Sequence, residues 1–147
     1  MSFISVCLWV SCKPSVTEQK SAETEAVSSD LQHYENEIMK IHDEAMPWMN
    51  DIHELSSKLR EIRADAPMTE EEKKNVPPGL DETLEALRTA ENSMMDWMKD
   101  YSDNKARMPA EQMHTFYERE LEKVTQVKTT MLNAIEKANA WLAAHPS

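Results

Sequence analysis

Apolar residues recur every three or four positions from Leu31 to Ile62. The full series is Leu31, Tyr34, Ile38, Ile41, Ala45, Trp48, Ile52, Leu55, Leu59 and Ile62. Such alternating steps are the a/d pattern of a helix that packs against other helices. The pattern therefore predicts a helix over residues 30–64, with Asp30 as an N-cap candidate. Pro47 lies inside the series, and because the apolar phase continues on both sides, we expect a kink there rather than a break.

Two further apolar stripes follow, and each predicts another helix. The first consists of Leu80, Leu84, Leu87, Met94, Trp97, Met98 and Tyr101; the second consists of Met113, Phe116, Tyr117, Leu121, Val124, Val127, Met131, Ile135, Ala138 and Leu142. We place these helices at residues 79–102 and 109–144, joined by a loop at 102–107. Pro109 suits the first turn of the last helix.

Together these patterns predict an all-α fold: an elongated, antiparallel three-helix bundle with coiled-coil-like packing over residues 30–145, preceded by a disordered N-terminal segment. Gly79 is the single glycine of the chain, and such poverty in glycine argues against hairpins and glycine-rich phosphate loops. The middle helix is the shortest, so part of the two long helices lacks a third partner. We expect this apolar surface to be covered by another chain or by the linker at 67–78.

Charge and cysteine content narrow the range of functions. The 147 residues carry a formal net charge of −11, which repels nucleic-acid phosphates and anionic lipid headgroups. We therefore expect no nucleic-acid partner. The two cysteines, Cys7 and Cys12, both precede the predicted bundle, so the folded part has no cysteines for a disulfide framework or a zinc site.

The opening segment resembles a signal peptide that directs a protein to the cell envelope. Phe3–Val10 is apolar but much shorter than the roughly 20 residues that span a bilayer. The sequence Trp-Val-Ser-Cys that ends at Cys12 resembles a bacterial lipobox, which implies cleavage before this cysteine and lipidation of its thiol. On this interpretation residues 1–11 are a signal-peptide-like segment and residues 12–29 hold the lipid-anchor cysteine and a flexible tether. The alternative is that residues 1–12 are the frayed tail of a cytosolic protein.

Three segments carry a resemblance to a protein family. They are Ile41–Met49 (IHDEAMPWM), Ala90–Met98 (AENSMMDWM) and Lys128–Lys137 (KTTMLNAIEK). Over most of residues 38–138 the chain resembles small lipoproteins of Bacteroidota that often carry the mistaken label "viral A-type inclusion protein". The resemblance implies a helical fold and a place in the cell envelope, and it transfers no catalytic residue.

Methionine and histidine form two clusters with possible metal chemistry. His42, Met46 and Met49 lie on the first predicted helix, and Met94, Met95 and Met98 lie on the second. Thioethers and imidazole suit Cu(I), so a copper site is possible if the clusters face each other. The alternative is that these methionines fill gaps in the core. Under either interpretation we expect Trp48, Trp97, Ile52 and Leu55 to be packing residues.

The sequence offers no clear catalytic constellation. Glu111-x-x-His114 has the spacing found in di-iron bundles, and Asp30-x-x-His33 is an aspartate variant of it. A di-iron centre needs two such motifs and a glutamate from each of two further helices, which three helices do not supply. A slim bundle also offers few desolvated pockets for a general acid or base. We therefore expect no enzymatic activity.

The sequence as a whole predicts a non-enzymatic lipoprotein of the cell envelope, located at the outer membrane and facing the periplasm or the surface. Its expected role is structural or adaptor-like: it presents a helical surface to a protein partner. Two alternatives remain. One is an envelope copper-binding protein, and the other is a soluble homodimer that buries the long apolar seam.

Overall fold

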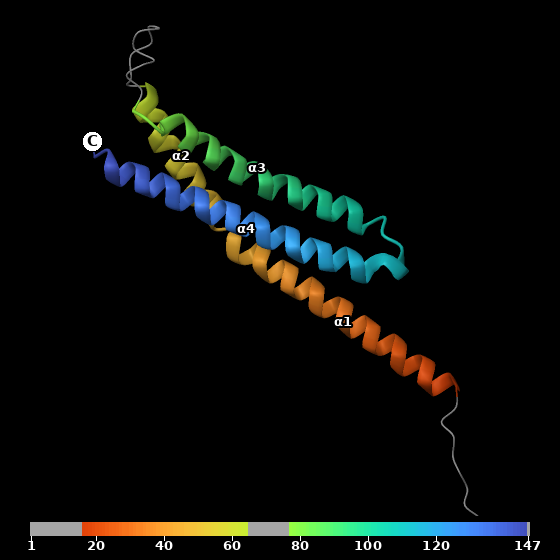
Figure 1. The fold of residues 1–147 in the computed structure, drawn as a ribbon. Coiled ribbons are helices and arrows are strands. Elements are labelled where there is room, and N and C mark those ends of the chain that lie inside the picture. The colour runs from red at the N-terminus through yellow and green to blue at the C-terminus, as the bar shows by residue number, and fades with distance from the viewer. Residues whose placement is uncertain (1–15, 65–76, 147) are drawn as a thin grey trace, which may run out of the picture.

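The computed structural model describes residues 16–64 and 77–146, and every element in these residues is helical. In chain order they are α1 (Val16–Ala45), α2 (Trp48–Ala64), α3 (Leu80–Lys105), the short 3-10 helix η2 (Ala110–Gln112) and α4 (Met113–Ala144). Figure 1 shows that α1 and α2 follow one another as one bent arm beside the α3–α4 pair. The prediction of an elongated, all-α three-helix bundle is confirmed.

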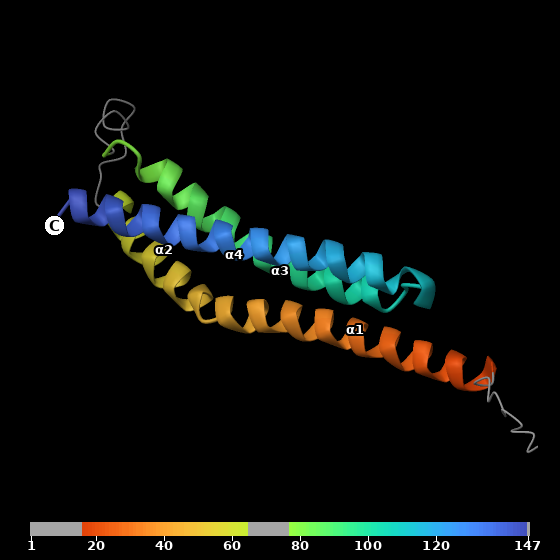
Figure 2. The ribbon, with the colours of Figure 1, turned by 60° about the horizontal axis from the view of Figure 1, so that its bottom comes forward.

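The helices pack unevenly on one another. α3 and α4 form an antiparallel hairpin, α2 packs on both of them, and α1 packs on α4 with little contact to α3. In Figure 2 the beginning of α1 extends past the turn that joins α3 to α4. The bundle is therefore closed at the α2 end and open between α1 and α3.

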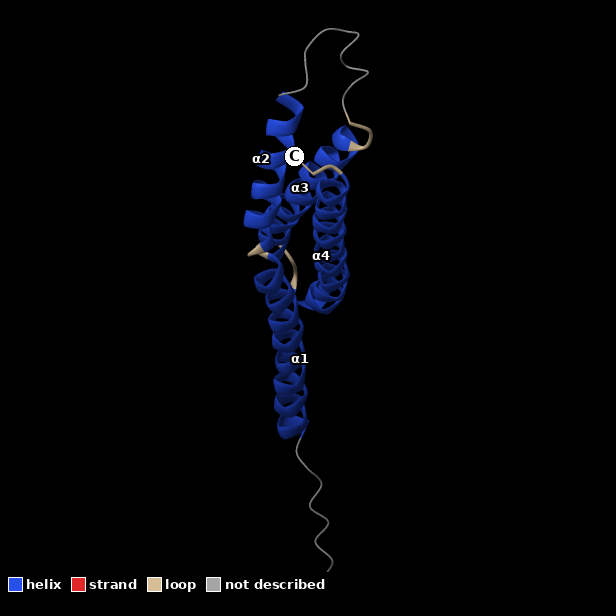
Figure 3. Ribbon diagram, turned by 90° about the vertical axis from the view of Figure 1, so that its left-hand side faces the viewer, coloured by secondary structure: helices blue, strands red, loops and turns tan. Residues whose placement is uncertain are grey.

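Pro47 interrupts the first arm more strongly than the kink we predicted. α1 ends at Ala45 and α2 begins at Trp48, with a two-residue turn between them (Figure 3). Proline has no N–H to donate, and its ring crowds the carbonyl four residues earlier. The Met49 N–H instead reaches back three residues to the Met46 carbonyl (3.1 Å). The apolar phase nevertheless survives, because residues of the same stripe are buried on both sides of the turn.

The first arm also begins earlier than predicted. α1 starts at Val16, so the backbone of residues 16–29 is helical where we expected a tether. Half of this stretch is Glu, Ala, Gln and Lys, which favour helix, and the stretch has no apolar stripe. Periodicity of apolar residues therefore could not reveal it. The signal-peptide-like segment at 1–11 and Cys12 lie outside the described residues.

The boundaries of the other two arms shift by a few residues. α3 continues to Lys105, through part of the segment that we expected to be a loop. Pro109 precedes η2, so α4 itself starts at Met113. At the other end of α3, Gly79 adopts a left-handed conformation (φ 82°), which an L-residue with a side chain rarely adopts. Its carbonyl accepts a hydrogen bond from the Thr83 hydroxyl (2.6 Å).

The core runs along the inner faces of all four α-helices. Its largest fully buried apolar side chains are Phe116, Ile38, Ile52, Leu59, Leu80, Leu87, Met94, Met131 and Val124. Of the expected packing residues, Ile52, Leu55 and Trp97 are buried, and Trp48 is half-buried against the core. In the part of the chain that the structure describes, no helix is long and apolar enough to cross a membrane.

Candidate binding groove

An apolar groove lies between α1 and α3, where these helices contact each other little. Its volume is about 570 Å³. The residues that line it are Met39 and His42 from α1, and Trp97, Met98, Tyr101, Ser102 and Lys105 from α3, with Ala106 just beyond the end of α3. We call it the α1–α3 groove. It exists because α1 and α3 both pack on α4 and make little contact with each other.

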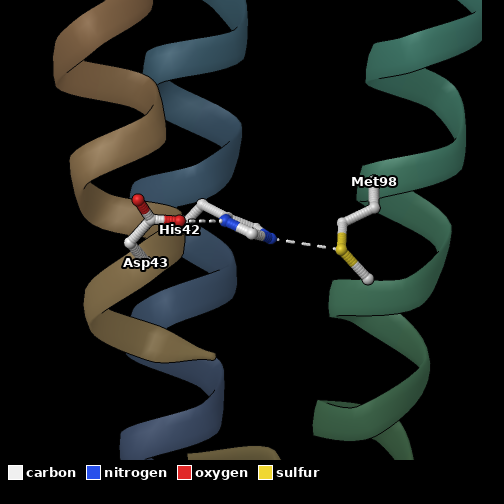
Figure 4. Close-up of polar contacts among 3 residues, drawn as sticks. All are labelled: His42, Asp43 and Met98. Atoms are coloured by element: carbon white, nitrogen blue, oxygen red, sulfur yellow. Dashed lines mark hydrogen bonds and ion pairs between the residues drawn. The ribbon is translucent and has the colours of Figure 1, made fainter. Parts of the chain in front are cut away.

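His42 projects from α1 across the groove toward α3. Its Nε2 lies 3.2 Å from the Met98 Sδ, and its Nδ1 lies 2.9 Å from the Asp43 Oδ1 (Figure 4). The His42 side chain is only 16% exposed, whereas the Asp43 carboxylate lies largely in solvent. The ring centroid of His42 also lies 5.8 Å from that of Trp97. The imidazole is thus fixed in position from three sides.

Behind the groove, a row of aromatic rings connects α3 to α4. The Trp97 ring stacks on Tyr101 with centroids 5.3 Å apart, and Tyr101 stacks on Phe116 at 5.8 Å. Offset stacking of this kind adds to the stabilisation that burial of the rings provides. The wall that α3 contributes to the groove is therefore rigid at Trp97 and Tyr101, and more adaptable at Met98.

The Trp97 side chain also takes part in a buried polar contact. Its indole Nε1 donates to the Glu120 Oε2 (3.1 Å), and the Lys123 Nζ donates to the Glu120 Oε1 (2.7 Å). Glu120 is 1% exposed, which is rare for a carboxylate unless it is paired and hydrogen-bonded. Glu120 was not predicted as a buried residue, because apolar spacing identifies only the apolar positions on the buried face of a helix.

A second polar cluster closes the end of the groove near Lys105. Lys105 and Tyr117 both donate hydrogen bonds to the Glu35 carboxylate, the latter at 2.8 Å. These two bonds, that from Lys105 first, lower the pKa of Glu35 below its ordinary value of 4.5. Burial, together with the nearby charges of Glu35 and Glu120, raises the pKa of Tyr101 to about 12. Through the Glu35 carboxylate, this cluster links α1 to both α3 and α4.

The structure brings two of the predicted metal ligands into direct contact. His42 and Met98 meet in the groove, whereas Met94 is fully buried in the core and Met95 is 53% exposed. Two further predicted ligands, Met46 and Met49, are partly buried against the core and are not among the residues that line the groove.

Met39, which we did not propose, does line the groove. It precedes His42 by three positions, the spacing that places two side chains on one face of a helix. This spacing was the signal that could have found it.

The candidate di-iron motifs come close together without forming a ligand set. Asp30, His33 and His114 line one surface hollow of about 300 Å³, and the rings of Tyr34 and His114 meet edge to face at 5.1 Å. Glu111 is not among the residues that line this hollow. Across the described residues, no group of three His, Cys, Asp or Glu side chains is arranged to hold a metal ion.

A hollow between α2 and α3 is charged rather than apolar. Its volume is about 780 Å³, and its lining includes Arg60, Arg63 and Arg88 together with three acidic side chains. Two of the arginines are paired there: Arg63 Nε lies 3.2 Å from an oxygen of Asp81, and Arg88 lies beside Glu85. These side chains are more than half exposed, so the pairs contribute little to stability. The hollow has the character of a solvated charged surface.

The α1–α3 groove therefore combines the apolar walls, buried aromatic rings and fixed histidine that a binding site needs. Cys12, the expected lipidation site, lies outside the described residues. Comparison with known proteins adds nothing to this picture, since no family model, no curated protein and no solved structure matches the chain.

Proposed function

We propose that this chain is a non-enzymatic, lipid-anchored adaptor of the cell envelope, and that its α1–α3 groove receives an amphipathic helix from a protein partner. The observation that carries the proposal is the groove itself: an apolar channel of about 570 Å³ between two helices that hardly contact each other.

The shape of the bundle supports a helical occupant. α1, α3 and α4 leave one side open, and a helix laid along the α1–α3 groove would complete a four-helix arrangement. Recognition of this kind buries the apolar face of an amphipathic helix in a hydrophobic groove. The occupant would then cover apolar surface that the chain itself leaves exposed.

The residues of the groove suit a protein contact. Trp97 and Tyr101, which are 6% and 8% exposed, form a rigid aromatic floor on which a partner side chain can pack. Met39, which is 37% exposed, and Met98 add flexible apolar surface that can adjust to the shape of a partner. The net charge of −11 further favours a partner helix with a basic polar face, through electrostatic steering.

The sequence supports the membrane anchor. The lipobox-like motif ends at Cys12, four positions before the first residue of α1 at Val16. A lipid on this cysteine would hold the molecule by the end of α1 that extends past the α3–α4 turn. Met39 is 23 residues further along α1, so the groove would stand about 35 Å from that end.

Intact-mass analysis of the protein from its native host tests the anchor. The expected result is a mature chain that begins at Cys12 and carries the mass of covalent lipid. An unmodified chain that retains residues 1–11 would overturn the anchor while leaving the groove proposal standing.

Site-specific photocrosslinking in the native host tests the groove. A benzophenone amino acid is placed at Ser102, an exposed residue that lines the groove, and in a matched variant at Gln126, an exposed residue of α4 outside it. We expect one discrete adduct from position 102 and not from position 126, with the linked peptide mapping to an amphipathic helix of another protein. Equal adducts from both positions, or none from position 102, would contradict the proposal. An adduct with a second copy of this chain would contradict the adaptor proposal and favour a homodimer instead.

A further inference from the structure

The surroundings of His42 present an unusual hydrogen-bonding problem. Its two ring nitrogens face the Asp43 carboxylate (2.9 Å) and the Met98 thioether (3.2 Å). A carboxylate and a thioether are both acceptors, and neither has a hydrogen to donate. A neutral imidazole carries one N–H, so it can donate to only one of these two neighbours.

Asp43 is the stronger acceptor and therefore takes the N–H from Nδ1. In that tautomer Nε2 carries no hydrogen, and Figure 4 shows this nitrogen facing the Met98 sulfur. Two lone pairs at 3.2 Å gain nothing from each other, and the imidazole is largely removed from water. A cation between Nε2 and Sδ would turn this unfavourable contact into two bonds.

We propose that the α1–α3 groove binds one Cu(I) ion between His42 Nε2 and Met98 Sδ, with the Met39 thioether as the third ligand. Thioether sulfur and imidazole nitrogen are soft or borderline donors that select Cu(I) over Mg²⁺ or Ca²⁺. Both methionines line the same apolar groove as His42, which is where a soft, weakly hydrated ion is best accommodated.

The geometry favours a bent site rather than a linear one. Metal–nitrogen and metal–sulfur bonds of about 2.0 and 2.3 Å sum to about 4.3 Å, which exceeds the 3.2 Å between Nε2 and Sδ, so the flexible Met98 thioether must swing aside as the ion binds along the Nε2 lone pair. This leaves one side of the ion open for a third ligand. Met39 precedes His42 by one helical turn and is 37% exposed, and its unbranched side chain is free to supply that ligand.

Asp43 acts as a positioning residue in this site. Its carboxylate holds the Nδ1–H of His42, which fixes the tautomer that presents Nε2 to the metal. Metal-binding histidines commonly donate their other ring N–H to a carboxylate in this way, and the contact raises the basicity of the ligand. The site therefore has a ligand, its supporting carboxylate and a sulfur partner already in place.

Competition between the protein and a Cu(I)-specific chromogenic chelator tests the proposal. The full-length chain is used with Cys7→Ser and Cys12→Ser, because free thiols bind Cu(I) strongly and would mask a thioether site. Met98→Leu and His42→Asn remove the proposed ligands. Met95→Leu, on the exposed face of the same helix, is the matched control. Methionine-to-leucine changes nearly conserve volume, and circular dichroism shows whether each variant folds.

We expect the thiol-free chain to take up one Cu(I), and expect both Met98→Leu and His42→Asn to weaken binding at least tenfold. Met95→Leu should bind as the parent does. Fluorescence gives an independent readout: binding should quench Trp97, whose ring lies 5.8 Å from that of His42, and a Trp97→Phe variant should lose that change. No uptake by the thiol-free chain, or equal affinity in Met98→Leu and Met95→Leu, would overturn the proposal. These measurements need no protein partner, so they fail or succeed independently of the adaptor proposal.

Discussion

The indole N–H of Trp97 on α3 donates a hydrogen bond to the carboxylate of Glu120 on α4, across 3.1 Å of the bundle core. Trp97 is 6% exposed and Glu120 is 1% exposed, so neither group can turn to water if the other is lost. This contact therefore fixes α3 against α4 directly behind the groove. It also makes the two residues energetically dependent on each other.

A double-mutant cycle measures this dependence. Trp97→Phe leaves the carboxylate with one donor fewer, and Glu120→Leu leaves the indole N–H without its acceptor; we expect each to lower the free energy of unfolding by about 1–3 kcal/mol. The double variant lacks both partners of the hydrogen bond. Its loss of unfolding free energy should therefore be smaller than the sum of the two single losses, by about 1 kcal/mol or more. Urea unfolding of all four proteins gives the coupling. Simple additivity would show that the hydrogen bond does not matter.

Two tyrosines of the same region should respond in opposite ways to loss of the hydroxyl. The Tyr101 hydroxyl is buried and has no hydrogen-bond partner among the described residues, whereas the Tyr117 hydroxyl donates to Glu35 at 2.8 Å. We expect Tyr101→Phe to leave stability unchanged or raise it by up to about 1 kcal/mol, because it removes an unpaired polar atom. Tyr117→Phe should cost about 1–2 kcal/mol. Urea midpoints check both values, and the reverse order would contradict the assigned contacts.

Stability should also fall in acid through Glu35. The hydrogen bonds from Lys105 and Tyr117 lower the pKa of Glu35 in the folded chain below 4.5. The ionised carboxylate therefore adds stability that is fully present above pH 4.5 and is lost as the pH falls through the lowered folded value. Glu35→Gln should thus be less stable than the parent at pH 7, and the difference between them should shrink toward pH 3.

Thermal unfolding at pH 7, 4.5 and 3 measures this effect. Glu54→Gln, at an exposed position on α2, serves as the control and should keep the parent's profile. If the gap between Glu35→Gln and the parent stays constant across this range, the paired carboxylate is not the source of the acid sensitivity.

The alternation of apolar residues was enough to predict three packed helical arms and their antiparallel order. This alternation could not predict features that do not depend on the spacing of apolar residues. The first turns of α1 form from a stretch that has no apolar stripe and in which Glu and Ala are the main residues that favour helix. Pro47 broke the arm into two helices because the loss of a backbone donor is local and does not disturb the phase of the stripe.

The candidate site was predictable only in part. Residue chemistry identified His42 and Met98, but their meeting depends on the rotation of α1 about α4, which spacing along one helix does not reveal. Glu120 escaped prediction because an isolated glutamate in an apolar stripe gives no sign that Trp97 will satisfy it. The open side of the bundle follows from uneven lengths and packing among the helices, which the sequence indicated only as uncovered apolar surface.

The central claim is that the apolar wall of the α1–α3 groove holds the partner. The most direct test is the yield of the photocrosslinked adduct from position 102 in two variants that fold equally well by circular dichroism. Met98→Glu places a charge inside the groove, and Met95→Glu places the same charge outside it on the same helix. We predict that Met98→Glu lowers the yield at least tenfold while Met95→Glu leaves it unchanged. Equal yields from the two variants would contradict the claim.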